Sequence, residues 1–243
     1  MPDDSSLHPV LDRPLKREAV VFTDELCTAL GEKLARGLEE LGLEATARQQ
    51  QTLVSSLVFL SEWNAVINLT AIREPHDMLV QHLLDSLSVL PHLPPAVAGK
   101  STTLLDVGSG GGFPALPLAV LRPDLAVVSI DSVRKKTDYV TKAATFLDLP
   151  NLGAVHSRVE DHRETYDVVL SRAYASLRDF VKSAGHAAPT DGKGTFLAMK
   201  GKVPDEEIAG LAKTGWRAER VLPLIVPFLD AARTLVWLKR EAK

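Results

Sequence analysis

Residues 104–114 read LLDVGSGGGFP, and this stretch decides the fold. An apolar run containing Asp106 leads directly into Gly108-x-Gly110-x-Gly112. This is the pattern of a buried parallel strand followed by a tight loop beneath a nucleotide-like ligand, because glycine tolerates positive φ and has no Cβ between its backbone and a ligand. A second apolar run, residues 126–130, ends in Asp131. An acid after the second strand is well placed to accept hydrogen bonds from ribose hydroxyls.

These strand ends together predict a nucleoside-containing cofactor, with S-adenosylmethionine as the first candidate. A dinucleotide site is an alternative, because Gly110-x-Gly112-x-x-Ala115 formally fits the G-x-G-x-x-G/A fingerprint. Counted from the strand end, however, Phe113 stands where that fingerprint needs a third small residue. The acid Asp106 inside the strand also favours a methyltransferase, whose ligand has no pyrophosphate to repel. A glycine-rich connection without any ligand is the remaining alternative. Methyl transfer is favoured.

The bulk properties are those of a soluble α/β protein. A length of 243 residues predicts one domain with a modest extension, and 45% hydrophobic with 24% charged residues is typical of globular chains. The net charge of −3 argues against a general polyanion binder, so nucleic-acid contacts would depend on local basic patches such as residues 134–136 (RKK).

We expect a cytoplasmic protein without membrane contact. No apolar run approaches the ~20 residues that cross a bilayer, the first residues lack the features of a secretory signal, and the single cysteine, Cys27, fits a reducing compartment. The seven histidines are scattered without a partner at ligand spacing, so we expect no metal.

Three segments are predicted: a loose tail over 1–22, a helical extension over 23–100 and a cofactor domain over 101–243. In the extension, leucine spacing predicts a helix over 24–41, Thr46-x-x-Gln49 resembles a capping box that opens a second helix, and a third is expected over 77–90. The leucines of the third helix fall on one arc. His82 and Asp85 fall on the opposite, polar side.

From residue 102 onward, short apolar strands alternate with helices, which predicts a mostly parallel sheet covered on both faces. The link between the last two strands is short, so these should pair antiparallel. The result is the seven-stranded, doubly wound, Rossmann-like sheet of class I S-adenosylmethionine-dependent methyltransferases. The strands are expected near 103–107, 126–130, 152–156, 167–171, 194–199, 220–226 and 234–239, and the helices at 114–122, 132–147, 175–186 and 204–213.

The chain also resembles the RsmG (GidB) family of bacterial methyltransferases over about residues 30–240. The motifs that carry the resemblance are WNxxxNLT (63–70), MLVxHxxDS (78–86), the glycine loop with Phe113-Pro114, DSxxKK (131–136), SRVE (157–160), SRA (171–173) and KG (200–201). Ala115 departs from the glycine that is usual in the family. The resemblance implies methylation of a guanine N7 in 16S rRNA, within the small ribosomal subunit or an assembly intermediate. We expect the enzyme to be a monomer.

The resemblance also implies roles for individual residues. The cofactor would contact Gly108, Gly110, Phe113, Asp131, Ser132, Val133, Val159, Glu160 and Arg172. The RNA would contact Asn68, Arg73, His82, Lys135, Arg158 and Lys200. Structural roles remain open beside these: a salt bridge for Arg172, helix capping for Asp131 and Glu160, and an ordinary solvated pair for His82 and Asp85.

We expect no catalytic acid or base. Guanine N7 has a free lone pair and no proton, so positioning and desolvation suffice. Residues 171–174 read SRAY, where enzymes that methylate exocyclic amines usually keep an Asn-Pro-Pro-Tyr-like segment. Two other functions remain as alternatives: methylation of a small metabolite, and a non-catalytic scaffold. The intact Gly108, Gly110 and Asp131 argue against the scaffold.

Overall fold

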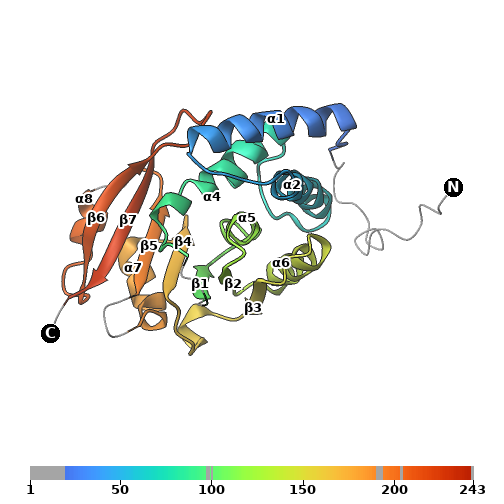
Figure 1. The fold of residues 1–243 in the computed structure, drawn as a ribbon. Helices are drawn as coiled ribbons and strands as arrows, with labels where there is room; N and C mark the ends of the chain where they lie inside the picture. Colours follow the sequence, from blue (N-terminus) through green and yellow to red (C-terminus); the bar gives the residue numbers. More distant parts are fainter. Residues whose placement is uncertain (1–19, 97–98, 100, 190–193, 203–204, 242–243) are drawn as a thin grey trace.

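The computed structural model describes residues 20–96, 99, 101–189, 194–202 and 205–241. At its centre is a seven-stranded sheet in the order β3-β2-β1-β4-β5-β7-β6 (Figure 1). The strands are β1 (Thr102–Val107), β2 (Leu125–Asp131), β3 (Leu152–His156), β4 (Val168–Arg172), β5 (Thr195–Lys200), β6 (Trp216–Leu224) and β7 (Arg233–Arg240). The predicted tail over 1–22 lies outside the described residues as far as residue 19.

The first five strands pair in parallel, and β7 is antiparallel to both β5 and β6. The predicted doubly wound sheet and its antiparallel final pair are therefore confirmed. The start of β7 lies beside the end of β5, where Thr234 is opposite Lys200. Because of this reversal, the first residues of β7 lie at the same sheet edge as the carboxyl ends of the parallel strands.

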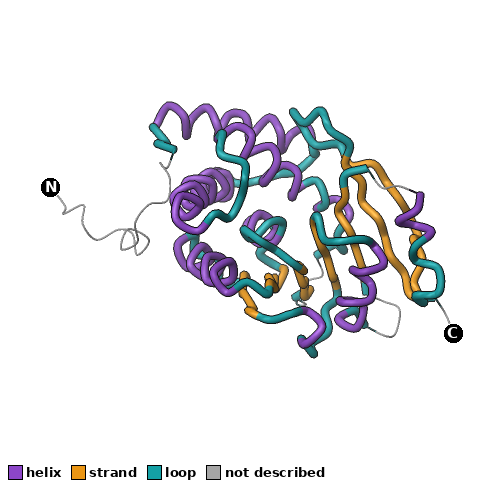
Figure 2. The backbone as a smooth tube through the Cα atoms, turned by 180° about the vertical axis from the view of Figure 1, so that it is seen from behind, coloured by secondary structure: helices purple, strands orange, loops and turns teal. Residues whose placement is uncertain are grey.

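Both faces of the sheet are buried at its central strands β1, β4 and β5. Along β1, Leu104 belongs to one hydrophobic cluster and its neighbour Leu105 to the other, as the period of two in a strand requires. Helices α5 (Ala115–Leu121) and α6 (Arg134–Phe146) cover one face, and α7 (Leu177–Ala184) covers the other (Figure 2). The continuous apolar runs of these strands thus reflect a sheet centre that is covered on both faces.

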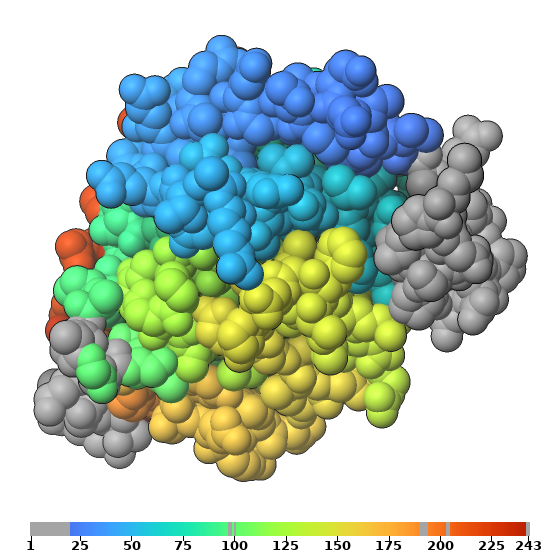
Figure 3. Space-filling view, turned by 45° about the vertical axis from the view of Figure 1, so that its right-hand side comes forward, coloured from blue at the N-terminus to red at the C-terminus, as the bar shows by residue number. Residues whose placement is uncertain are grey.

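The N-terminal helices form a further layer over α5 and α6. Helix α1 (Asp24–Glu40) packs on α2 (Ala47–Ile67), which in turn contacts both α5 and α6 (Figure 3). The capping box predicted at Thr46 is present. No helix in the described part of the chain is long and apolar enough to cross a membrane.

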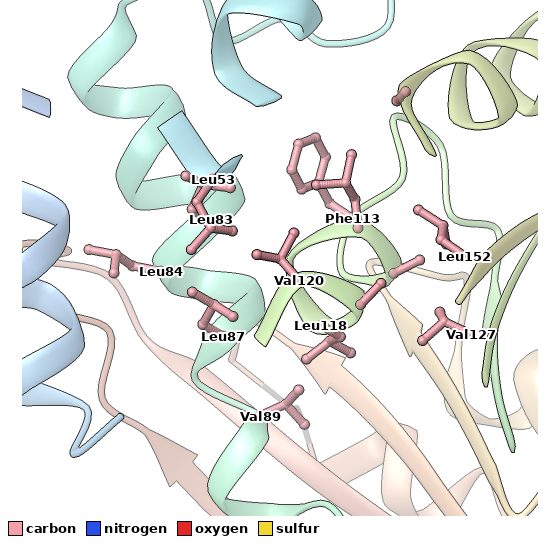
Figure 4. Close-up of a cluster of buried hydrophobic side chains, with 14 of the residues drawn as sticks. Leu53, Leu83, Leu84, Leu87, Val89, Phe113, Leu118, Val120, Val127 and Leu152 are labelled. Atoms are coloured by element: carbon pink, nitrogen blue, oxygen red, sulfur yellow. The ribbon is translucent and has the colours of Figure 1, made fainter. Parts of the chain in front are cut away.

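The N-terminal layer and the sheet domain share one hydrophobic cluster. Leu53 of α2 and Leu83 and Leu87 of the next helical segment lie close to Val120 of α5 (Figure 4). Side chains from the sheet, such as Val127, belong to the same cluster. Packing therefore fixes the position of the N-terminal helices relative to the glycine loop.

The third predicted helix differs from the expected continuous helix over 77–90. It begins earlier, as α3 (Pro75–Met78), continues as a π-helical segment η1 (Leu79–Leu84) and ends as α4 (Asp85–Leu87), with a separate 3-10 turn η2 (Leu90–His92). The prediction that His82 and Asp85 lie on a polar outer face is wrong. Both residues are buried, because the segment is covered by α1 and α2 on one side and faces the glycine loop on the other.

The other differences from the prediction are two shorter helices, a 3-10 turn after β3 and an earlier start of β6. Helix α7 ends at Ala184 and continues as the 3-10 turn η4 (Gly185–Ala187), and α8 spans only Asp205–Ala209. A 3-10 turn, η3 (Val159–Asp161), follows β3. Strand β6 begins at Trp216, four residues before the predicted start. The prediction began too late because the residues just after Trp216 are mostly exposed and lack the apolar pattern of a buried strand.

Candidate active site

The glycine loop is fixed to the end of β2. The N–H groups of Gly108 and Ser109 donate to the carbonyl of Ile130, over 2.9 and 3.3 Å. Gly108, Gly110 and Gly112 have φ of +70°, +59° and +79°, as the motif predicted. A Cβ built on Gly110 would meet nothing closer than 4.0 Å, so this glycine faces open space. The loop is therefore shaped to let a ligand approach its backbone.

Asp131 connects this loop to the next helix. One carboxylate oxygen accepts a hydrogen bond from the Gly110 N–H (3.1 Å) and the other from the Val133 N–H (2.8 Å). The Lys136 ammonium lies 3.5 Å away. The capping role considered from the sequence is not present, because α6 begins after Val133 without a side-chain cap hydrogen bond, and Asp131 instead holds the loop that leads into the helix. This arrangement involves one hydrogen bond on each oxygen. It leaves acceptor capacity, since an ionised carboxylate has about four lone-pair positions.

Two adjoining cavities share Gly108. The first has a volume of about 540 Å³ and the second about 320 Å³. The second is lined by Asp131, Ser132, Val133, Val159 and Glu160, five of the residues predicted to contact the cofactor, and by Lys136, Arg158 and Tyr174. The first is lined by the other four, Gly108, Gly110, Phe113 and Arg172, and by Thr70, His82, Asp85, Lys200 and Arg233, among others.

A buried ion cluster forms part of the wall of the first cavity. Arg172 Nη1 donates to an Asp85 carboxylate oxygen (3.0 Å) and to the Gln81 carbonyl (2.6 Å). Arg233 Nε donates to the other Asp85 oxygen (3.1 Å). The salt bridge considered for Arg172 therefore exists, and the same side chain also lines the cavity. Its guanidinium lies 5.8 Å from the centroid of the Phe113 ring.

His82 lies between the N-terminal layer and the glycine loop. Its ring stacks on Phe113, and its Nε2 lies 3.0 Å from the Thr70 hydroxyl. Burial, and secondarily the charge of Arg172, lowers the pKa of His82 to about 3. The imidazole is thus neutral at physiological pH. The interpretation of His82 and Asp85 as a solvated pair is wrong, because only 6% and 4% of these residues are exposed.

Asp106 lies below the loop and is almost fully buried. One carboxylate oxygen accepts from the Ala115 N–H (3.0 Å), and the other has no hydrogen-bond partner among the described residues. Burial raises the pKa of Asp106 to about 7. The strand acid noted in the sequence is therefore a structural support of the loop with an unusual protonation equilibrium.

The six predicted RNA-contacting residues lie in different environments. His82 and Lys200 line the first cavity, and Arg158 is exposed at the second. Lys200 is also paired with Glu207, over 3.0 Å. The remaining three, Asn68, Arg73 and Lys135, are exposed and line neither cavity.

Sequence reasoning missed several cavity residues, above all Arg233. It follows the short link 227–232 (PFLDAA) and belongs to no motif, so no sequence signal marks it. Lys136 had a signal, since it follows Asp131 by five residues at the start of α6. Among the described residues, no group of three or more His, Cys, Asp or Glu side chains is arranged to hold a metal ion.

Comparison of the amino-acid sequence with known proteins identifies a matching family. The model of the family described as rRNA small subunit methyltransferase G (GidB) matches residues 49–236. A ribosomal RNA small subunit methyltransferase G from Bordetella pertussis is 49% identical over 216 residues, which is 86% of this chain and 93% of that protein. The protein of the same name from Methylobacillus flagellatus is 45% identical over 209 residues, covering 85% and 97%.

The fold also matches solved structures at lower identity. A SAM-dependent methyltransferase from Aquifex aeolicus superimposes with a TM-score of 0.50 at 19% identity, covering 68% of this chain and 93% of that one. At this identity the likeness concerns the fold alone. It agrees with the seven-stranded sheet predicted from the sequence.

Proposed function

The chain belongs to the rRNA small subunit methyltransferase G family, and on this premise we propose that it transfers the methyl group of S-adenosylmethionine to N7 of a guanine in 16S rRNA of the small ribosomal subunit. The observation that carries the proposal is the meeting of two cavities at Gly108. One adjoins the acid that ends β2, and the other is lined by hydrogen-bond donors. A nucleoside cofactor and an acceptor base would meet between them.

The lining of the second cavity fits the nucleoside half of the cofactor. Asp131 would accept hydrogen bonds from the ribose hydroxyls with its remaining lone pairs, while the Gly110 and Val133 N–H groups hold its carboxylate in place. We assign the adenine to Ser132, Val133, Val159 and Glu160, and the methionine part to Gly108, Gly110, Phe113 and Arg172.

The proposed reaction requires no general acid or base from the protein. The bound cofactor supplies an electrophilic methyl carbon on a positively charged sulfur. Once bound, the cofactor would donate this methyl group to the lone pair of guanine N7, with the electrons of the S–C bond going to sulfur and the positive charge passing to the base. No proton is removed, so the residues act by positioning the base and excluding water. A neutral His82 and an Asp85 that holds two arginines agree with this.

The RNA contacts would divide into two groups. The exposed side chains of Asn68, Arg73, Lys135 and Arg158 would contact the sugar–phosphate backbone, which positions the RNA without reading its sequence. His82 and Lys200 lie inside the first cavity and would act on the base. We also infer that the enzyme acts in the cytoplasm, since its proposed substrate is ribosomal RNA, and we propose that it acts as a monomer.

The test is to map N7-methylguanine in 16S rRNA by mass spectrometry in cells with and without this protein. We expect deletion to remove one methylated guanine, and the wild-type protein to restore it. An Arg172→Ala variant should not restore it. Unchanged rRNA methylation after deletion would contradict the proposal and favour a small-molecule acceptor.

A further inference from the structure

The ion cluster in the first cavity carries an excess of positive charge. Asp85 binds two guanidinium groups, one on each carboxylate oxygen, from Arg172 at the end of β4 and Arg233 at the start of β7. Only 6% of the Asp85 side chain is exposed, against 19% for Arg172 and 23% for Arg233. Two cations thus share one anion, and both retain a surface toward the cavity that they line.

Each arginine uses two of its five N–H donors, and the two differ in the surroundings of the remaining donors. Arg172 uses Nη1 for two hydrogen bonds, and its guanidinium lies against Phe113 of the glycine loop. Arg233 uses Nε for Asp85 and Nη1 for the carbonyl of the adjacent Ala232. Within the described residues, Nη2 of Arg233 makes no hydrogen bond. Arg233 therefore offers a free donor on a guanidinium whose direction Asp85 fixes.

The enzyme must distinguish guanine from adenine, because N7 is an acceptor in both bases. The two differ at position 6, where guanine has the acceptor O6 and adenine has an amino donor. Among the described residues that line this cavity, Asp85 is the one carboxylate, and both its oxygens accept hydrogen bonds from the arginines. The site thus offers a donor for O6 and leaves an adenine amino group facing cations, which is how a polar site rejects the wrong base.

We propose that Arg233, held by Asp85, recognises the target guanine by donating a hydrogen bond to O6. N7 stays free for the methyl group, since the contact is made at the neighbouring atom. The inference rests on the proposed function, which it deepens by naming the residue that selects the base. Arg172 lies nearer the glycine loop and keeps its proposed role in contacting the cofactor.

The experiment is a double-mutant cycle in which the side chain at position 233 and the O6 atom of the target base are removed separately and together. Single-turnover methylation is measured on reconstituted small-subunit rRNA that carries either guanine or 2-aminopurine, which keeps N7 and lacks O6, at the target position. We expect wild type to be slower on 2-aminopurine by roughly tenfold to a hundredfold, the discrimination typical of a specific base contact. Arg233→Met should lose the same factor on guanine and nothing further on 2-aminopurine.

Arg220→Met is the matched control, because Arg220 lies on the adjacent strand, contacts the Trp237 ring and lines neither cavity. It should behave as wild type on both substrates. Arg233→Lys keeps the charge beside Asp85 and tests the same contact if the methionine variant is unstable; it should lose part of the guanine preference. Equal losses on both substrates for the Arg233 variants would overturn the inference and assign Arg233 to a phosphate or to structure. If wild type methylates neither substrate, the proposed function itself fails.

Discussion

The imidazole of His82 stacks on the phenyl ring of Phe113, with the ring centroids 4.7 Å apart and the planes inclined by 16°. The first ring belongs to the π-helical segment of the N-terminal layer, and the second ends the glycine loop of the sheet domain. The contact joins the side of the cavity that we assign to the RNA to the side that we assign to the cofactor. It also makes the N-terminal helices part of the site.

Substitution of Phe113 tests this connection. Phe113→Ala removes a buried ring that contacts both His82 and Arg172, so we expect a loss of unfolding free energy of about 3–5 kcal/mol. Urea denaturation measures it. Phe146→Ala serves as the control, because Phe146 stacks on Phe59 but is 54% exposed, and it should cost clearly less. Equal costs would show that the Phe113 stack adds nothing specific.

Asp131→Asn tests the acid at the end of β2. The amide offers only one acceptor oxygen, so one of the N–H groups of Gly110 and Val133 would face an NH₂ group. Since hydrogen bonds to charged groups contribute about 1.5–3 kcal/mol, affinity for S-adenosylmethionine should fall by tenfold or more. Calorimetric titration gives the affinity, with exposed Asp138→Asn of α6 as the control. Wild-type affinity would remove Asp131 from the cofactor site.

Arg172→Met tests the residue at the junction of the cavities. Its loss leaves Asp85 with Arg233, so the chain should still fold, while single-turnover methylation should drop at least about tenfold. Cofactor binding measured in parallel separates a chemical from a binding defect. Exposed Arg178→Met on α7 should match wild type in both assays. Normal methylation by the Arg172 variant would leave that residue with the salt bridge alone.

The raised pKa of Asp106 predicts that the unfolding free energy of the protein declines as the pH rises. The pKa of Asp106 in the folded protein is about 7, above the usual value of about 3.8, so between these values the folded state keeps a proton that the unfolded state releases. The contribution of this group to the unfolding free energy should fall by up to about 1.4 kcal/mol per pH unit from pH 4 to 7. Asp106→Asn should remove that slope when unfolding is measured across the range. Parallel profiles for variant and wild type would contradict the assignment.

His82 should give a pH dependence of stability opposite to that of Asp106. Its pKa in the folded protein is about 3, below the ordinary 6.5, so the unfolded state binds a proton first as the pH falls. The contribution of His82 is present above pH 6.5 and is lost toward pH 3. His82→Phe keeps a ring against Phe113 and does not titrate. Its unfolding free energy relative to wild type should rise as the pH falls from 6.5 to 4, and a constant difference would count against a buried neutral imidazole.

Local patterns were sufficient for much of the fold and for one half of the site. The apolar run before Asp106, the glycines after it and the acid at the end of β2 lie within about 30 residues, and the carboxyl ends of parallel strands meet at one sheet edge. The capping box at Thr46 is likewise a contact between residues three apart. Such features depend on short-range chemistry that a sequence displays directly.

The other half of the site was decided by tertiary structure. Arg233 and Asp85 are 148 residues apart, and they meet because the antiparallel β7 begins at the edge where the parallel strands end. The helical period placed His82 and Asp85 on an outer face, yet that face is buried against Phe113 and Arg172. The sequence by itself determined the sheet, the loop and the acids at the strand ends, because these follow from local periodicity and backbone chemistry. Only packing between distant segments decided which polar side chains are enclosed, since burial depends on what the rest of the chain places beside them.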